Sequence, residues 1–190
     1  MKNRFLIYIF LFLLGLPQLS FAMSTELGLS YSRKKTSFDE SNFFDSESTT
    51  GSASFYFMET VALELSYTEA TGIRQEKASS TDSKRTIIQS TQVIGSDLIY
   101  VLAGRQALLQ PYIKGGGARI SRKQEVQIEG FGTQTLEPEV ALVPSYGAGL
   151  KIAVTSQLGI KFSYDAWQTP IGSGQTTSDN SIRAGVTWLF

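Results

Sequence analysis

The chain ends in the segment Ile182-Arg-Ala-Gly-Val-Thr-Trp-Leu-Phe190, which has a two-residue period. Every second position is apolar, namely Ile182, Ala184, Val186, Trp188 and Phe190. The positions between them begin with Arg183, Gly185 and Thr187, which are charged, small or polar. Successive side chains of a β-strand point to opposite faces of a sheet, so this period predicts a strand with one apolar face.

Seven earlier segments repeat this alternation. Apolar side chains share one phase in residues 27–31, 53–57, 61–67, 94–102, 146–152 and 158–164, and a glycine-rich segment surrounds Ile113. Together with the C-terminal segment they make eight predicted strands. Their lengths are near the ~9–11 residues that a tilted strand needs to cross a bilayer.

The predicted connections alternate in length. Those at residues 58–60, 104–107 and 153–157 are short, whereas those at 33–48, 69–86, 121–139 and 168–180 are long and polar. A barrel threaded through a membrane sorts its connections in this way. The sequence therefore predicts an all-β fold, an eight-stranded antiparallel transmembrane up-and-down β-barrel with short periplasmic turns and long extracellular loops.

The two faces of these strands carry different chemistry. The apolar phase would face lipid, and the other phase would point charges into the barrel. The expected lumen charge network comprises Glu64, Asp97, Lys114, Lys151, Lys161, Asp165 and Arg183, with Glu26 as a further acid near the rim. The alternative is a soluble barrel or sandwich with these charges in water, which leaves the sorting of the connections unexplained.

Pairing the predicted strands sets specific neighbours. If Leu102 faces Leu109, Asp97 faces Lys114, and we expect these two residues to form an ion pair. If Ile152 faces Leu158, Lys151 opposes Gly159 and Lys161 opposes Gly149. Because an eight-stranded barrel is just wide enough for side chains and unpaired buried charges are costly, we expect a salt-bridged, plugged lumen.

Residues 1–22 have the pattern of a secretory signal peptide. A basic start precedes an apolar run at 5–16, and Ser20-Phe21-Ala22 predicts cleavage after Ala22. The alternative is a transmembrane anchor, which needs about 20 apolar residues, and Pro17 interrupts this run too early. We therefore expect residues 23–190 to be the barrel domain.

The composition excludes several classes of function. The chain has no Cys and no His, so disulfides, thiolate zinc sites, thiol nucleophiles and the usual general base are absent. Seventeen basic and seventeen acidic residues balance, which does not favour nucleic acid as a partner. We expect no enzymatic activity, no cofactor and no metal site.

Four local motifs have alternative interpretations. Gly115-Gly116-Gly117 lacks the context of a phosphate loop and fits a crowded lumen better. Asp39, Glu40, Asp45 and Glu47 could bind a divalent cation, but a solvated acidic loop is the default. Arg33, Lys34 and Lys35 would contact lipopolysaccharide or simply be solvated. The glycine turn near Gly130 predicts that the flanking strands protrude, with edges that another protein could pair with.

The sequence resembles the small eight-stranded outer-membrane barrels of Gram-negative bacteria, the OmpA/OmpX/OmpW-like porin family. Asp97-Leu-Ile-Tyr-Val-Leu with Pro111-Tyr-Ile-Lys-Gly-Gly-Gly, and Tyr146-Gly-Ala-Gly-Leu-Lys, resemble the hairpins of that group. The C-terminal strand resembles the signal recognised by the barrel assembly machinery, with Val186, Trp188 and Phe190 as its alternating apolar residues. The resemblance implies the bacterial outer membrane, with its lipid and lipopolysaccharide, as the location.

Two functions remain open from the sequence. The first is a structural or surface-interaction protein whose outer loops bind lipopolysaccharide, a host surface or a neighbouring protein. The alternative is a narrow channel or porin for small or hydrophobic solutes. The state of the lumen distinguishes them, because a lumen filled with paired charges does not conduct.

Overall fold

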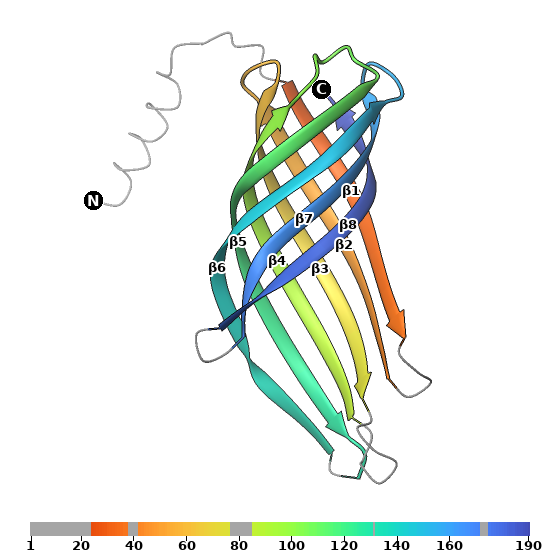
Figure 1. Ribbon diagram of the computed structural model, residues 1–190, viewed down its shortest axis with the longest axis vertical. Helices are drawn as coiled ribbons and strands as arrows, with labels where there is room; N and C mark the ends of the chain where they lie inside the picture. The colour runs from red at the N-terminus through yellow and green to blue at the C-terminus, as the bar shows by residue number, and fades with distance from the viewer. Residues whose placement is uncertain (1–23, 38–41, 77–84, 131, 172–174) are drawn as a thin grey trace, which may run out of the picture.

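The structure is a computed structural model that describes residues 24–37, 42–76, 85–130, 132–171 and 175–190 (Figure 1). The predicted signal peptide at residues 1–22, with cleavage after Ala22, lies outside the described residues. Within the described residues, no helix has the length and apolar composition required to cross a membrane.

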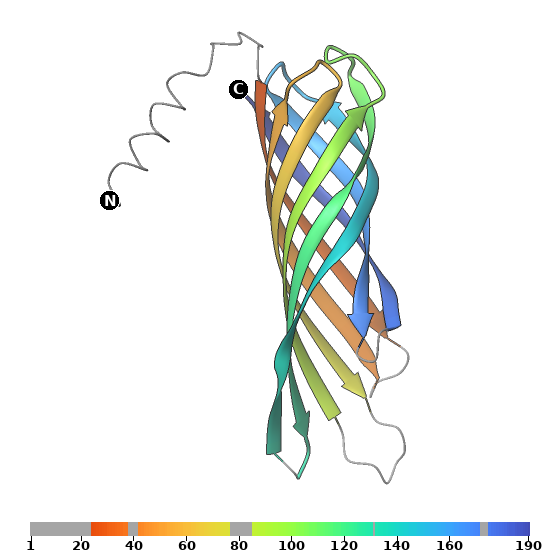
Figure 2. The ribbon, with the colours of Figure 1, turned by 90° about the vertical axis from the view of Figure 1, so that its left-hand side faces the viewer.

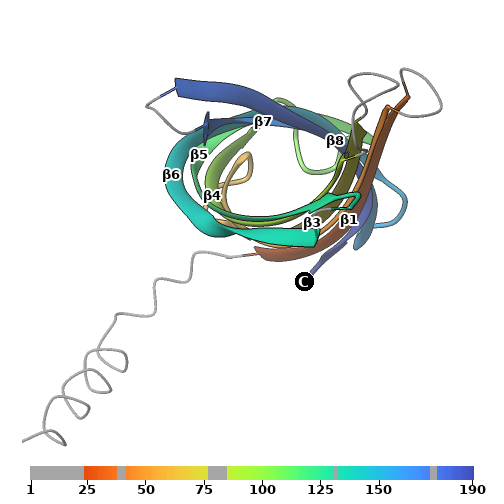
Figure 3. The ribbon, with the colours of Figure 1, turned by 90° about the horizontal axis from the view of Figure 1, so that it is seen from below.

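Eight antiparallel strands form one closed barrel. They are β1 (Ser24–Ser37), β2 (Phe43–Tyr56), β3 (Val61–Glu76), β4 (Arg85–Val101), β5 (Leu109–Ile128), β6 (Gly132–Ala153), β7 (Leu158–Ile171) and β8 (Gln175–Leu189). Each strand pairs with the next along the chain, and β1 pairs with β8 to complete the ring (Figure 3). The predicted eight-stranded antiparallel up-and-down barrel is confirmed.

The apolar face of the strands points outward. In β3, Glu64 is 2% exposed, whereas the flanking Leu63 and Leu65 are 40% and 47% exposed. Leu98 and Phe162, on β4 and β7, are likewise 52% and 45% exposed. A soluble barrel would bury these side chains in its core, so the soluble alternative is wrong. An outward belt of this kind is typical of strands that face lipid.

The strands extend well beyond the predicted boundaries. β3 continues to Glu76 and β4 begins at Arg85, so much of the predicted loop at 69–86 is strand. β5 continues to Ile128 and β6 begins at Gly132. The hairpin that they form projects past the other strands (Figures 1 and 2). Polar residues interrupt the apolar period in the other extensions, which is why the sequence indicated loops at 33–48, 69–86 and 168–180. The protrusion of the strands within 121–139 was predicted from the glycine turn.

A tight turn closes the projecting β5–β6 hairpin. Gly130 and Gly132 have φ values of 85° and 91°, a region that glycine adopts without strain. This agrees with the glycine turn predicted there, although Phe131 lies outside the described residues. We call this the projecting end of the barrel, and the opposite end, with turns at residues 57–60, 102–108 and 154–157, the short-turn end.

The ring is closed over only part of its height. The β1–β8 ladder runs from Glu26 opposite Leu189 to Tyr31 opposite Ala184. The β6–β7 ladder runs from Ala153 opposite Gly159 to Ser145 opposite Trp167. Among the described residues, the β7–β8 hairpin therefore has no ladder partner beyond these points, and it diverges from β1 and β2 at the projecting end (Figures 1 and 3).

The predicted β4–β5 register is wrong by two residues. Asp97 lies opposite Gly116, and Lys114 lies opposite Ile99. The connection is wider than the sequence indicated, because the Gln110 side-chain amide donates hydrogen bonds to the carbonyl oxygens of Arg105 and Ala107, at 2.7 and 3.0 Å. A shift of two residues preserves the face of every side chain, so the inward residues remain inward.

The predicted β6–β7 register is also wrong by two residues. Lys151 lies opposite Lys161, not Gly159, and Gly149 lies opposite Ser163, not Lys161. The turn at 154–157 sets this register, since Thr155 Oγ1 accepts the backbone N–H groups of Gln157 and Leu158, at 3.2 and 2.9 Å. The two facing lysines are accommodated because each reaches a different carboxylate, as described below.

Candidate functional site in the barrel interior

Lys114 is the centre of an ion network inside the barrel. Its Nζ lies 2.9 Å from Glu64 Oε1, 3.2 Å from Asp97 Oδ2 and 2.7 Å from Asp165 Oδ1. These four residues come from β3, β4, β5 and β7, and their side chains are almost fully buried. One ammonium group with three donors thus links four strands across the lumen.

Two further bases complete the network. Lys161 Nζ lies 2.5 Å from Glu64 Oε2, and Arg183 Nη1 lies 3.4 Å from Asp165 Oδ2. The structure therefore joins six of the seven predicted lumen residues: Glu64, Asp97, Lys114, Lys161, Asp165 and Arg183. Each carboxylate has a base within ion-pair distance, which is what burial of these charges requires.

Lys151 belongs to a separate pair nearer the short-turn end. Its Nζ lies 2.6 Å from Glu26 Oε2 and donates to the Tyr56 hydroxyl at 3.2 Å. Glu26 is 4% exposed, so the acid expected at the rim is in fact buried. The network and this pair together contain four acids, Glu26, Glu64, Asp97 and Asp165, and four bases, Lys114, Lys151, Lys161 and Arg183, so their charges balance.

Serine hydroxyls that the sequence analysis did not single out bind the carboxylates. Ser54 donates to Glu64 at 3.3 Å, Ser145 to Asp97 at 2.5 Å and Ser163 to Asp165 at 2.8 Å. These serines share the inward phase of their strands with the charged residues. The alternation in the sequence could therefore have predicted that these serines point into the lumen. It could not have predicted which carboxylate each serine binds.

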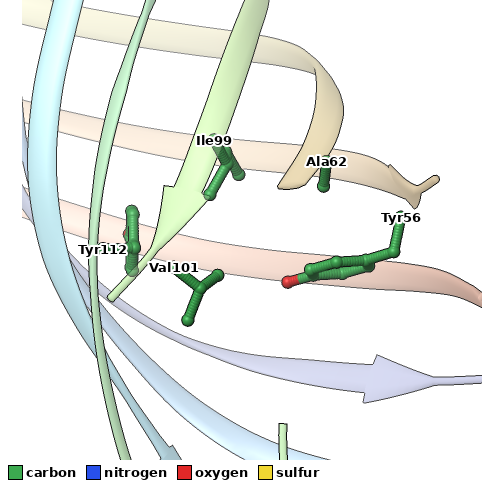
Figure 4. Packing of buried hydrophobic residues seen from close by; sticks show 5 residues of the cluster. All are labelled: Tyr56, Ala62, Ile99, Val101 and Tyr112. Carbon is green, nitrogen blue, oxygen red and sulfur yellow. The ribbon is translucent and has the colours of Figure 1, made fainter. Parts of the chain in front are cut away.

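Apolar layers lie on both sides of the ion network. Toward the short-turn end, Tyr56, Ala62, Ile99, Val101 and Tyr112 pack together (Figure 4). Toward the projecting end, Val93, Ala118, Ile120 and Val143 form a second cluster, with Trp167 packed against it. Along β4 the inward order is Val93, Asp97, Ile99 and Val101, so the charged layer lies between two apolar ones.

The cavities next to the network are small. Three cavities that it lines have volumes of about 20, 10 and 20 Å³. Each is close to the minimum for a single water molecule. A much larger cavity of about 470 Å³ lies at the short-turn end, beyond Tyr56 and Val101.

The glycine triplet on β5 has one position with no room for a side chain. A Cβ at Gly116 would overlap the Ser96 carbonyl oxygen on the neighbouring strand and press against Asp97. Gly115 and Gly117 face outward, where a Cβ would meet only ordinary contacts at 3.9 and 3.7 Å. Crowding therefore explains why residue 116 is a glycine, but it does not explain the glycines at 115 and 117.

At the projecting end, two acids of the predicted acidic segment, Asp45 and Glu47, lie beside Arg33. Arg33 Nη2 lies 3.1 Å from Asp45 Oδ2, and its Nε lies 3.4 Å from Glu47 Oε1. The hydrogen bond from Arg33 holds the pKa of Asp45 below its usual value. Asp39 and Glu40 lie outside the described residues, within which no group of three potential metal ligands occurs.

The C-terminal strand places its apolar phase on the outer surface. Val186, Trp188 and Phe190 are all exposed, and the rings of Trp188 and Phe190 lie 6.4 Å apart. The backbone N–H of Phe190 donates to the Thr25 carbonyl oxygen at 2.8 Å. The last residue is thus held at the β1–β8 closure, at the short-turn end.

Comparison with known proteins identifies the class to which this architecture belongs. A family model described as the outer membrane protein beta-barrel domain matches residues 8–190. A search of curated proteins found no match. Among solved structures, the chain is similar to the N-terminal barrel of OprF from Pseudomonas aeruginosa, with 18% identity and a TM-score of 0.56 over 88% of this chain and 97% of that one.

Two other solved barrels show a similar fold. The Neisserial surface protein A has 15% identity and a TM-score of 0.55, over 88% of this chain and 97% of that one. Ail from Yersinia pestis has 14% identity and a TM-score of 0.56, over 88% of this chain and 99% of that one. The chain therefore belongs to the outer-membrane β-barrel family, and it is a protein of the bacterial outer membrane.

Proposed function

We propose that this chain is a non-conducting outer-membrane barrel with a structural or surface-interaction role, performed at its projecting end. The observation that carries the proposal is the paired charge layer around Lys114, enclosed between two apolar layers. A solute crossing the barrel would have to separate buried ion pairs and displace packed apolar side chains. Both are costly, so the interior is better suited to anchoring strands than to transport.

Catalysis is not part of this proposal. The chain has no His and no Cys, so the usual general base and thiol nucleophile are missing. The acids and bases of the interior already neutralise one another in ion pairs. No residue among them is left to activate a nucleophile.

The projecting strands are the proposed contact surface. β5 and β6 extend furthest, and the ladders that flank the β7–β8 hairpin stop short of its tip. Open strand edges are able to pair with an extended segment of another protein. Ail, which has the same fold, was solved with the heparin analogue sucrose octasulfate, so a barrel of this architecture can hold a ligand.

Lipopolysaccharide is a proposed second partner, through Arg119 together with Lys34 and Lys35 of the predicted basic cluster. Arg33 is already neutralised by Asp45 and Glu47. Arg119 points outward, and among the described side chains no carboxylate lies within ion-pair distance of it. Its ladder neighbours Ile94 and Leu142 are 51% and 84% exposed, which places this cation at the edge of the apolar belt, where lipid phosphates lie.

The proposal includes the route to the membrane. Cleavage after Ala22 would release the mature barrel, and Val186, Trp188 and Phe190 would present the last strand to the barrel assembly machinery. The short turns would then face the periplasm and the projecting end the exterior. This orientation is the usual one for barrels with unequal ends.

Planar bilayer recordings test the interior. The purified protein is expected to give no steady conductance, because the charge layer is enclosed by apolar layers. Steady unitary currents that Lys114→Ala increases would instead support the alternative, a narrow channel for small or hydrophobic solutes, and would contradict the proposal.

Cysteine labelling tests the orientation, since the chain has no cysteine of its own. Glu129→Cys, at the projecting hairpin, is expected to react with a membrane-impermeant maleimide in intact cells. Ser156→Cys, in a short turn, is the matched control and should react only after the outer membrane is permeabilised. The reverse pattern would place the projecting end in the periplasm and would contradict a surface role.

A further inference from the structure

The cavity of about 470 Å³ at the short-turn end has a closed floor. Tyr56 and Val101 line it, and both belong to the apolar layer that separates it from the ion network. Figure 4 shows this layer, with the Tyr56 ring lying across the lumen beside Val101. The cavity is therefore a vestibule that ends within the barrel, suited to holding a ligand rather than passing one through.

Arg105 differs from the other cations that point into the barrel. Lys114, Lys151, Lys161, Arg122 and Arg183 each have a carboxylate within 4 Å. The half-buried Arg105 also lines the vestibule, but among the described side chains it has no such carboxylate. Its Nη1 donates to Ser24 Oγ at 2.7 Å, and its guanidinium carbon lies 5.0 Å from the centre of the Tyr56 ring.

The remaining lining combines apolar and uncharged polar side chains with one ion pair and one rim carboxylate. Val154, Leu158 and Leu189 line the vestibule, and at its floor Lys151 is paired with Glu26. Glu59 lies at the rim, where its carboxylate accepts the backbone N–H of Arg105 at 3.4 Å. The vestibule thus combines an apolar wall, an aromatic ring and one guanidinium whose remaining N–H groups are available to an anion.

We propose that this vestibule binds a small amphiphilic carboxylate, with the carboxylate on the Arg105 guanidinium and an apolar or aromatic body against Tyr56, Leu158 and Leu189. A planar guanidinium is suited to binding a carboxylate through two parallel hydrogen bonds. The apolar body replaces water along the wall. This site lies at the opposite end from the proposed contact surface and does not depend on it.

Fluorine NMR of the protein in lipid nanodiscs tests the site. The probe is para-trifluoromethylphenylacetate, measured against empty nanodiscs, and its primary amide is the neutral analogue. The carboxylate is expected to bind in the millimolar range or tighter, because a ligand of this size makes few contacts. The amide is expected to bind about tenfold more weakly, since it lacks the charge-assisted hydrogen bonds.

Substitutions test whether the preference for the carboxylate over the amide depends on Arg105. Arg105→Gln is expected to weaken carboxylate binding about tenfold and to leave the amide unchanged, whereas Arg105→Lys should retain part of the affinity. Arg85→Gln removes the same charge from the exposed start of β4, away from the vestibule, and should have no effect. Equal binding of acid and amide, unchanged binding to Arg105→Gln, or no binding above empty nanodiscs would each overturn the proposal. Failure here would leave the conductance and labelling tests unaffected.

Discussion

Lys114 is the residue on which the barrel interior depends most. Lys114→Met leaves Asp97 without its base and removes one partner from both Glu64 and Asp165. Removing one partner of a buried ion pair costs about 3–5 kcal/mol, so we expect a loss of that size in the free energy of unfolding. Urea unfolding in lipid vesicles, followed by the gel mobility of unboiled samples, measures it.

Lys123→Met is the matched control for this substitution. Lys123 lies on the projecting part of β5, and its pair with Glu125 at 3.4 Å is exposed to solvent. We expect little change, because exposed ion pairs contribute little. Equal losses for the two variants would mean that the interior pairs are no stronger than surface ones.

Substitutions at two adjacent glycines of β5 distinguish the effect of steric crowding from the effect of backbone flexibility. Gly116→Ala is expected to destabilise the barrel by about 1–3 kcal/mol, because its Cβ would meet the backbone of β4, which cannot shift without disrupting the ladder. Gly117→Ala is the control and should be neutral or slightly stabilising, since it has room and loses less conformational entropy on folding. The same urea measurement applies, and equal effects would contradict the crowding argument.

The Arg33–Asp45 pair predicts a pH dependence at the projecting end. Because Arg33 lowers the pKa of Asp45 in the folded protein, the pair stabilises the fold above the ordinary aspartate pKa and is lost as the pH falls through the lowered one. NMR titration should place the Asp45 carboxyl below its reference value of 3.8, and Arg33→Gln should raise it. An unchanged midpoint in Arg33→Gln would show that the hydrogen bond is not formed in solution. The effect on stability is small, since both groups are exposed.

At the level of strands, the sequence determined which side chains share a face but not where the ladders align. The phase of Leu98 and Asp97 on β4 gave their outward and inward positions correctly. The register depended on hydrogen bonds within the turns, from Gln110 and Thr155, which no alternation of residue types encodes. Because the error was two residues, Asp97 still lies 3.2 Å from Lys114 on the diagonal.

Strand length was predicted only in part from the sequence. The turn near Gly130 predicted that β5 and β6 protrude, and pairing with β4 and with each other sets their bounds. The polar ends of β1, β2 and β3 gave no such signal. Likewise, Arg105 and Ser54 gave no signal of their own. Their roles come from the closure of the barrel, which brings distant segments together.

The C-terminal strand β8 gives a prediction that separates assembly from stability. Deleting Phe190 removes an exposed aromatic side chain and one hydrogen bond to Thr25. If Phe190 is part of the assembly signal, cells should insert several-fold less barrel, while refolding of the purified protein into detergent stays nearly unchanged. Phe162→Ala, which removes an outward aromatic from β7, is the control and should insert normally. Comparable insertion of the two variants would contradict the assembly role.

At the scale of the whole molecule, polarity is inverted relative to a soluble protein. The apolar belt faces outward, and the ion network around Lys114 lies inside between two apolar layers. If the interior is sealed as proposed, the barrel's stability depends on ion pairs that bulk electrolyte does not reach. The sequence anticipated the inversion from phase and charge balance, but the apolar layers above and below the network emerged only from the closed ring.

That enclosure predicts a weak dependence of stability on salt. In ~1 M sodium chloride the screening length falls to about 3 Å, which weakens exposed ion pairs but affects buried ones much less. We expect the urea midpoint of the wild type to change little between low salt and ~1 M salt, and the loss caused by Lys114→Met to persist in both. If salt instead lowered the wild-type stability toward that of Lys114→Met, ions would be entering the charge layer. The apolar layers at Tyr56 and Val93 would then not seal the interior, and the channel alternative would regain support.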